Sequence, residues 1–287
     1  MSLFDSLRNS RMLRKPLLGL ARLVLDQMQG GPRVLRRALY DAMPGPYAIA
    51  SHAEHFVVST KDKVIGREVF LYGEFDFHKL VTAFQVLRSE GHKTPCHLID
   101  VGANIGTIAI PAINRGLVKS ATAIEPHPDN LKLLHANIAL NGMVDKVRVL
   151  PHAVGSQAGV SLMLEESADS SGNHSIGSMG IAVRSLRLDD IDFPEGCLLW
   201  MDIEGYEGHA LTGGARLLAQ GTPVVSEFNP TFLKRSGGLA LFESALAGRR
   251  LYDLEMPAVG VVTLDKIAQR LRTKLDHDQW TDILALP

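Results

Sequence analysis

Residues 97–106 have the sequence HLIDVGANIG, in which an apolar run leads directly into a segment with two glycines. The run has the length and the apolar character of a buried strand. Gly102 and Gly106 predict a tight turn, because glycine adopts backbone conformations that other residues avoid. The pattern that follows at 107–115 indicates a helix, so the stretch predicts a strand, a turn and a helix in succession.

The same alternation of strand and helix patterns continues toward the carboxyl end. Successive βαβ units of this kind build a parallel sheet with helices on both faces. The sequence therefore predicts an α/β fold with a doubly wound sheet. We expect further strands at 120–124, 147–150, 197–201, 222–227, 250–254, 259–264 and 281–286, and helices at 129–141, 209–219, 239–247 and 266–275.

Residues 156–192 interrupt the alternation. Two strand patterns, 160–164 and 181–187, flank the polar segment 165–178, which contains no apolar run. Segments of this composition lie at the surface, so we expect an exposed and mobile loop there.

The residues before 97 show other patterns. Residues 1–45 have apolar residues at helical spacing, and we expect one or two amphipathic helices there. Residues 55–60 and 63–72 are rich in strand-forming residues, and 77–89 has a helical pattern. We divide the chain into a basic helical N-terminal extension, 1–53, and one α/β domain, 54–287.

Composition and charge exclude several classes of protein. The chain has 287 residues, 46% of them hydrophobic and 21% charged, which is typical of a globular protein and not of a disordered or fibrous one. A net charge of -1 creates no overall field that would attract nucleic acid. Residues 1–40, however, contain eight basic and two acidic residues. A basic amphipathic helix of this kind can lie on an anionic membrane surface.

Cysteine content and hydropathy bear on location. The chain has two cysteines, which is too few for a disulfide framework and favours a reducing compartment. The apolar stretch 16–25 is interrupted by Arg22 and lacks a cleavage site, so it does not resemble a signal peptide. We therefore expect a cytoplasmic protein, with residues 1–45 as a candidate peripheral membrane contact.

The glycine turn has the features of a nucleotide-type site. Ligands of open α/β sheets bind at the carboxyl ends of the strands, where glycine lets the backbone come close to them. Glu125 ends the strand pattern 120–124, at the place where an acidic residue binds ribose hydroxyls. The spacing GxxxG differs from the GxGxxG fingerprint of dinucleotide sites, which disfavours a nicotinamide-dependent oxidoreductase.

A second group of acidic residues follows the strand pattern 197–201. The sequence there is WMDIEGYEG, which places Asp202 and Glu204 on the turn after the strand. Because carboxyl ends of parallel strands meet at one edge of a sheet, we expect this turn to face the ligand of the glycine turn.

Taken together, these motifs resemble the FkbM-type family of S-adenosylmethionine-dependent methyltransferases. The resemblance rests on DVGANIG at 100–106, on Glu125-Pro126 with the later Asn137, and on DIEGYE at 202–207. It extends over roughly residues 58–287. It implies a Rossmann-like class I methyltransferase fold with a seven-stranded sheet, S-adenosylmethionine as the cofactor, and a hydroxyl of a small molecule or sugar as the methyl acceptor.

The resemblance also implies roles for single residues at the cofactor site. The loop from Gly102 through Asn104 to Gly106 would leave room for the methionine part, and Asp100 would anchor that loop or accept from the methionine ammonium. Glu125 would bind the ribose, while His152 and Ala153 would border the adenine. Asp202 would face the bound cofactor.

Methyl transfer to oxygen depends mainly on positioning, with help from a base that removes the acceptor's proton. Asp202 and Glu204 are the catalytic candidates on the acidic turn. His174 is a third candidate, because it belongs to the polar loop 165–178 and such loops often close over a substrate. His209, near the start of a predicted helix, is a weaker one.

Two further features keep alternatives open. The family usually has lysine two residues before the first acid of the DxEG motif, where this chain has Trp200. That departure indicates a different acceptor or reduced activity. It also leaves open a protein that binds the cofactor without catalysing a reaction. Asp202, Glu227 and Asn229 together resemble oxygen-rich magnesium sites, although we predict no metal ligands. Aromatic residues show no regular stacking array, so we expect no nucleic-acid partner.

Overall fold

The computed structural model describes residues 16, 19, 20, 23, 24, 32–167, 172, 174–273 and 279–287. Most of the helical pattern predicted within residues 1–31 therefore lies outside the described residues. So does Asn173, next to the catalytic candidate His174.

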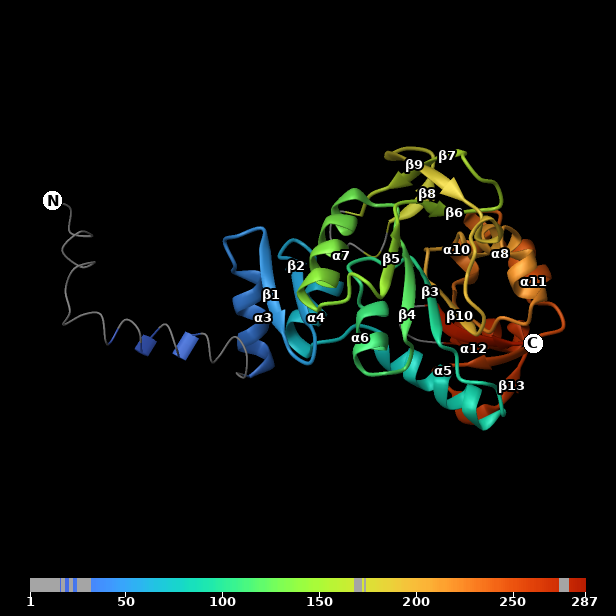
Figure 1. The fold of residues 1–287 in the computed structure, drawn as a ribbon, viewed down its shortest axis with the longest axis horizontal. Helices are drawn as coiled ribbons and strands as arrows, with labels where there is room; N and C mark the ends of the chain where they lie inside the picture. The colour runs from blue at the N-terminus through green and yellow to red at the C-terminus, as the bar shows by residue number, and fades with distance from the viewer. Residues whose placement is uncertain are drawn as a thin grey trace.

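An eight-stranded sheet forms the centre of the molecule (Figure 1). Strands β5, β4, β3, β10 and β11 are parallel neighbours, while β14 is antiparallel to both β11 and β12. The predicted α/β fold with a doubly wound sheet is confirmed, and the short β13 adds an eighth strand beside β12. Across the sheet the order is β13 (Val261–Val262), β12 (Arg250–Asp253), β14 (Thr281–Leu286), β11 (Val224–Phe228), β10 (Cys197–Met201), β3 (His97–Val101), β4 (Ser120–Ile124) and β5 (Val147–Leu150).

Helices cover both faces of this sheet. Side chains alternate between the faces along each strand, so apolar residues on both faces need a covering layer. On one face, Leu98 and Trp200 pack with α5 (Phe77–Ser89), α6 (Ala109–Asn114) and α7 (Pro128–Leu140). On the other, Ile99 and Leu199 pack with α8 (Glu207–Thr212), α9 (Ala215–Ala219), α10 (Pro230–Arg235), α11 (Leu239–Leu246) and α12 (Leu264–Thr273). The central strands β3, β10, β11 and β14 are buried on both sides, as the apolar runs predict.

The helix predicted at 209–219 is instead two helices, α8 and α9, with Gly213 and Gly214 between them. A Cβ atom on Gly213 would lie 2.1 Å from the carbonyl oxygen of Gly155. This close backbone approach, which no periodicity signals, separates the two helices.

The N-terminal part contains α3 (Arg33–Asp41), the hairpin of β1 (Tyr47–Ser51) and β2 (His55–Ser59), and α4 (Ile65–Tyr72). The prediction of a strand at 63–72 is wrong. Its β-branched and aromatic residues favour a strand, yet Ile65, Val69 and Phe70 are buried at helical spacing on one face of α4. Tertiary packing of that face outweighs the local preference.

Two contacts join this part to the sheet domain. The Asn137 side chain of α7 accepts a hydrogen bond from Val57 N–H at 2.7 Å and donates one to the carbonyl of Ile105 at 2.9 Å. The buried Glu54 carboxylate receives two hydrogen bonds from Arg115, at 3.0 and 2.9 Å. Figure 1 shows β2 beside α7. The division at 53/54 stays a prediction, with the two strands of one hairpin on either side of it.

A small second sheet has the order β6 (Ala153–Val154), β9 (Ile181–Leu186), β7 (Ser161–Glu165) and β8 (Ser175–Gly177), and lies at the top of Figure 1. Strand β8 falls inside the segment 165–178 that the sequence predicts as a loop. It pairs antiparallel with β7, so part of that segment is held against the second sheet.

Candidate functional site

The turn after β3 and the turn after β10 are in direct contact. Gly102 has φ +83°, and a Cβ atom there would lie 1.9 Å from the carbonyl oxygen of Asp202. The backbone N–H of Asp202 donates to the carbonyl of Val101 at 3.0 Å. Only glycine permits this approach. The two motifs found in the sequence therefore form one edge of the site, as predicted.

Glu125, at the end of β4, is bound to the same turn. Its Oε2 accepts a hydrogen bond from the backbone N–H of Asn104 at 2.8 Å, and its Oε1 accepts one from that of His127 at 2.8 Å. Asn104 has φ +49°, which turns its N–H toward the carboxylate. Burial raises the pKa of Glu125. The carboxylate is thus oriented by backbone contacts before any ligand binds.

These residues line a first cavity at the carboxyl ends of β3, β4 and β10. Of the predicted cofactor-binding residues, six line it: Gly102, Asn104, Glu125, His152, Ala153 and Asp202. Ile124 and Val154 provide apolar wall beside Ala153. The cavity therefore combines an apolar slot with an oriented carboxylate and backbone at a glycine turn.

Asp100 and Gly106 do not line this cavity. Asp100 is buried, and its Oδ2 accepts a hydrogen bond from the N–H of Ala109 at 3.2 Å, at the start of α6. Burial raises the pKa of Asp100 to about 7. A Cβ atom on Gly106 would lie 2.7 Å from Ile110 Cδ1 and 3.0 Å from Leu134 Cδ1. Both residues therefore contact the helices α6 and α7 that support the turn, and not the cavity.

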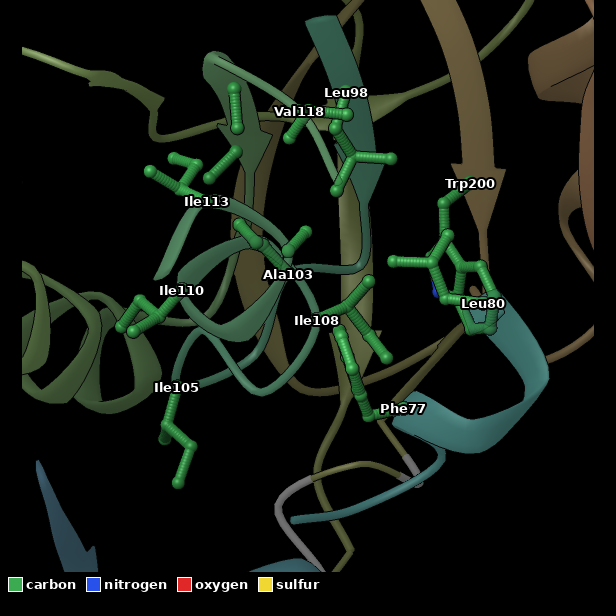
Figure 2. Close-up of a cluster of buried hydrophobic side chains, with 14 of the residues drawn as sticks. Phe77, Leu80, Leu98, Ala103, Ile105, Ile108, Ile110, Ile113, Val118 and Trp200 are labelled. Carbon is green, nitrogen blue, oxygen red and sulfur yellow. The ribbon is translucent and has the colours of Figure 1, made fainter. Parts of the chain in front are cut away.

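Trp200 is buried in the face of β10 that packs against α5. Figure 2 shows its indole beside Leu80, within the cluster that includes Ile108 and Phe77. It is 3% exposed and lines the first cavity from this side. Trp200 thus forms an apolar wall at the position where the lysine usual in the family would bring a positive charge into the site.

A second cavity adjoins the first. It is lined by the carboxylates of Asp76, Asp202, Glu204 and Glu227 together with Asn229, and by the aromatic rings of Phe75, Phe232 and Trp280. Asp76 and Asp202 line both cavities. Asp76 is bound to Lys79 Nζ at 3.0 Å. Asp202 makes no side-chain hydrogen bond or ion pair within the part of the chain that the structure describes.

The carboxylates of this region raise each other's pKa. Burial, and then the Glu204 carboxylate, raises the pKa of Asp202 well above its usual value. Burial raises the pKa of Glu204 to about 7, with a smaller contribution from Glu207. For Glu227 the causes are burial and then Asp202, and its pKa is also well above the usual value. Glu204, with a pKa of about 7, can exchange protons at physiological pH.

The two histidine candidates differ in position. His174 lines the first cavity, stacks on His127 with ring centroids 4.2 Å apart, and accepts a hydrogen bond from Ser167 N–H at Nδ1. Burial, and then His127, lowers the pKa of His174 to about 4. Its Nδ1 lone pair is thus already used. His209 stacks on Tyr206 and contacts the carbonyl of Ser236, and it lines neither cavity.

Within residues 32–167, 172, 174–273 and 279–287, no group of three or more His, Cys, Asp or Glu side chains has the arrangement of a metal site. Glu227 and Asn229, which the sequence connects with magnesium, do line the second cavity together with Asp202.

Comparison with known proteins identifies the family. A sequence profile of the family described as "Methyltransferase FkbM domain" matches residues 100–255, which is more than half of the chain. The chain belongs to the FkbM methyltransferase family. The matched region of this FkbM chain contains the glycine turn, Glu125 and the acidic turn. A comparison with curated proteins returns no match.

Solved structures of methyltransferases show distant similarity to this FkbM chain. The FkbM methyltransferase from Methylobacillus flagellatus KT is 17% identical over 76% of this chain, with a TM-score of 0.45. The chain spans about half the length of that protein, since 52% of it is covered. TYW2 from M. jannaschii, solved in complex with AdoMet, is 11% identical over 85% of each chain, with a TM-score of 0.45. An RNA methyltransferase from Salinibacter ruber, in complex with S-adenosyl-L-homocysteine, is 20% identical over 51% of this chain and 74% of its own, with a TM-score of 0.30.

Sequence reasoning assigned no site role to several residues that line the second cavity. Asp76 and Phe75 come from the turn before α5, and Trp280 comes from the segment before β14. Asp76, just before a helix, has the sequence pattern of an ordinary helix cap. No local signal near residue 280 indicates a site, because its position depends on the antiparallel insertion of β14 next to β11.

Proposed function

We propose that this protein transfers a methyl group from S-adenosylmethionine to a hydroxyl oxygen of a small molecule or carbohydrate. The observation that carries the proposal is Asp202, a carboxylate without a side-chain partner in the described structure, at the junction of two cavities. The first cavity has the features of a nucleoside site, and the second has polar groups suited to a hydroxylated acceptor.

The residues of the first cavity fit the cofactor. Glu125 is held by backbone N–H groups in an orientation that leaves lone pairs for the ribose hydroxyls. Ile124, Ala153 and Val154 form an apolar slot for the adenine, with His152 at its edge. Gly102 and Asn104 bring backbone close to the methionine part. Bound there, S-adenosylmethionine supplies an activated methyl group.

In the second cavity, Asp202 is the proposed proton acceptor for the acceptor's hydroxyl. Glu204 is the second candidate, and its carboxylate tunes Asp202 by raising its pKa. A positioned base of this kind contributes roughly a hundredfold to ten thousandfold to rate. His174 is less suited, because the lone pair at Nδ1 accepts the Ser167 N–H. We assign it to the wall of the cofactor cavity.

The proposal assigns no step to a metal ion. Asp202, Glu227 and Asn229 offer the oxygen atoms that magnesium accepts, so the assignment needs a direct test. We expect dialysis against EDTA to leave the methyl-transfer rate unchanged and added magnesium to have no effect. A loss of activity on dialysis that magnesium restores would show that these oxygens bind a metal.

Calorimetry and a transfer assay test the proposal together. S-adenosylmethionine and S-adenosylhomocysteine should bind, and labelled methyl should pass to one or more members of a panel of hydroxylated acceptors. Asp202→Asn should lower transfer by roughly a hundredfold to ten thousandfold, far more than it weakens cofactor binding, whereas Glu243→Gln on the exposed face of α11 should change neither. Cofactor binding without transfer to any acceptor would favour a binding module. Binding of reduced nicotinamide in place of the methyl donor would favour an oxidoreductase.

We also propose that the basic residues 1–45 contact an anionic membrane surface. Of the described residues there, Leu20, Leu23 and Val34 are exposed at 59%, 56% and 82%. Arg36 takes no part, because it is buried and donates to the carbonyls of Phe70 and Leu71. None of the helices described is long and apolar enough to cross a bilayer.

Vesicle sedimentation tests this contact. Removal of residues 1–31 leaves α3 and the Arg36 contacts in place. The full chain should pellet with phosphatidylglycerol vesicles and not with phosphatidylcholine vesicles. The truncated chain, which keeps Val34, should pellet less with phosphatidylglycerol vesicles than the full chain. Equal pelleting of the two chains would contradict the proposal.

A further inference from the structure

The second cavity has more carboxyl groups than cations to pair with them. Its lining includes four carboxylates, and in the described part of the chain no lysine, arginine or histidine lines it. The Lys79 ammonium is engaged with two other groups: it contacts Asp76 at 3.0 Å and Asp282 at 2.6 Å. After these pairs are formed, the carboxyl groups of Asp202, Glu204 and Glu227 have no matching cation. Burial raises their pKa values, and an ammonium group beside them would favour their charged form.

One of these carboxylates is buried without a partner. Glu227 is 7% exposed, and its Oε2 is inaccessible and accepts no hydrogen bond from the described residues. A buried acceptor left without a donor destabilises a fold, so such a group needs an explanation, and a donor brought by a ligand is one. Glu227 stands at the end of β11 and lines the second cavity.

The position of these charges distinguishes the acceptor from the cofactor. Glu204 and Glu227 line the second cavity and are absent from the lining of the first, whereas Asp202 lines both. A cofactor held beside Glu125 therefore meets Asp202, while Glu227 faces the space beyond it. The unmatched charge belongs to the part of the site that the acceptor would enter.

The aromatic rings of the cavity are compatible with a cation. Trp280 already holds the Lys79 ammonium 4.3 Å from its ring centroid. Phe75 and Phe232 line the same cavity and present further ring surface. Aromatic faces attract ammonium groups, and they repel anions for the same electrostatic reason.

From these observations we infer that the second cavity selects an acceptor that carries an ammonium group close to its hydroxyl, such as an amino alcohol or an amino sugar. The assignment of this ligand as a methyl acceptor rests on the proposed function. The cation preference itself rests on Glu227, Glu204 and Asp202. A phosphate-rich acceptor such as a nucleic acid would meet unmatched negative charge here.

Three matched probes test the charge preference on the full chain. They are the trans isomers of aminocyclohexanol, cyclohexanediol and hydroxycyclohexanecarboxylate, which share a ring and a hydroxyl and differ in charge. At about pH 8 the alkylammonium remains protonated. The chain has two tryptophans, and Trp280 lines the second cavity, so its fluorescence reports binding. Titrations with and without S-adenosylhomocysteine give dissociation constants that do not depend on turnover.

We expect the ammonium probe to bind at least about tenfold more tightly than the diol, and the carboxylate probe to bind more weakly than the diol. Glu227→Gln should reduce the ammonium probe's advantage by about tenfold and leave the diol unaffected, and Glu204→Gln gives a second, independent variant. Glu243→Gln should behave like the unaltered chain.

The outcomes separate this inference from the proposed function. Equal binding of ammonium and diol probes, or tightest binding of the carboxylate probe, overturns the inference and leaves methyl transfer to neutral hydroxyls intact. Competition of magnesium chloride with the ammonium probe at micromolar concentration also overturns it, because the carboxylates would then serve a metal ion. If S-adenosylmethionine does not bind but the ammonium probe still binds more tightly than the diol, the proposed function is contradicted and the inference is not.

Discussion

The substitution Gly102→Ala tests the contact on which the site is built. Gly102 has φ +83°, and an added Cβ would lie 1.9 Å from the Asp202 carbonyl oxygen, well under the 3.0 Å that real Cβ contacts respect. The two turns must then separate by about 1 Å. The change therefore moves Asp202 relative to the cofactor cavity without altering any charged side chain.

The matched control is Gly142→Ala. Gly142 has φ +65° but has no atom within 4 Å of its added Cβ. Both substitutions place an L-residue in the left-handed region, which costs about 1–2 kcal/mol. The control isolates this backbone strain, and the difference between the two variants reports the displacement of the acidic turn.

Urea unfolding and calorimetry with S-adenosylhomocysteine measure the two effects. Gly142→Ala should lose about 1–2 kcal/mol of unfolding free energy and keep its affinity. Gly102→Ala should lose more stability and bind the cofactor product at least about tenfold more weakly, and since a shift of about 1 Å can cost a hundredfold in rate, methyl transfer should fall by roughly that factor. If both variants bind alike and lose the same stability, the turns do not define the site.

Three further outcomes are expected. Asp100→Asn should weaken the pH dependence of stability. Burial raises the pKa of Asp100 to about 7, so the folded state holds a proton that the unfolded state has lost above about pH 4, and the unfolding free energy falls as the pH rises to 7. An unchanged dependence of the unfolding free energy on pH, measured by urea unfolding, would contradict this. Glu204→Gln should shift the pH–rate profile of methyl transfer to lower pH, because Glu204 is, after burial, the main cause of the raised pKa of Asp202. The other charged neighbours, Asp76, Asp282 and Lys79, are unaltered. A pH–rate profile with the same midpoint would count against this. Asn137→Leu should lower the unfolding free energy by about 1–3 kcal/mol for each backbone group of Val57 and Ile105 left without a partner, and urea unfolding of equal stability would exclude this role.

The sequence by itself determined the central strands and the order in which they occur. Strands predicted at 97–101, 120–124, 147–150, 197–201 and 281–286 have those bounds. The three central ones, 97–101, 120–124 and 197–201, are apolar runs buried on both faces and are followed by glycine or an acidic residue. Residues at the ends of these strands, Gly102, Glu125 and Asp202, line the first cavity as expected, since parallel strands place their carboxyl ends at one edge.

The local sequence pattern could not distinguish residues that line the first cavity from residues that only pack against the neighbouring helices. Asp100 and Gly106 belong to the same motif as Gly102, yet they face α6 and α7 and not the cavity. Residues 63–72 have strand-forming composition and nevertheless form α4, because burial of Ile65 and Val69 against the hairpin outweighs that preference. In each case the deciding partner is distant in the chain.

Only the tertiary structure produced the second cavity and its charge. Asp76, Glu204, Glu227 and Trp280 come from four separate segments. The sequence indicates Glu204 and Glu227 as candidates, but Asp76 and Trp280 have no local pattern that differs from an ordinary cap or strand end. Insertion of β14 between β11 and β12 places residue 280 at the edge where β10 and β11 end. Carboxylate repulsion and a missing donor at Glu227 are properties of distances between segments, so they arise only once the chain has folded.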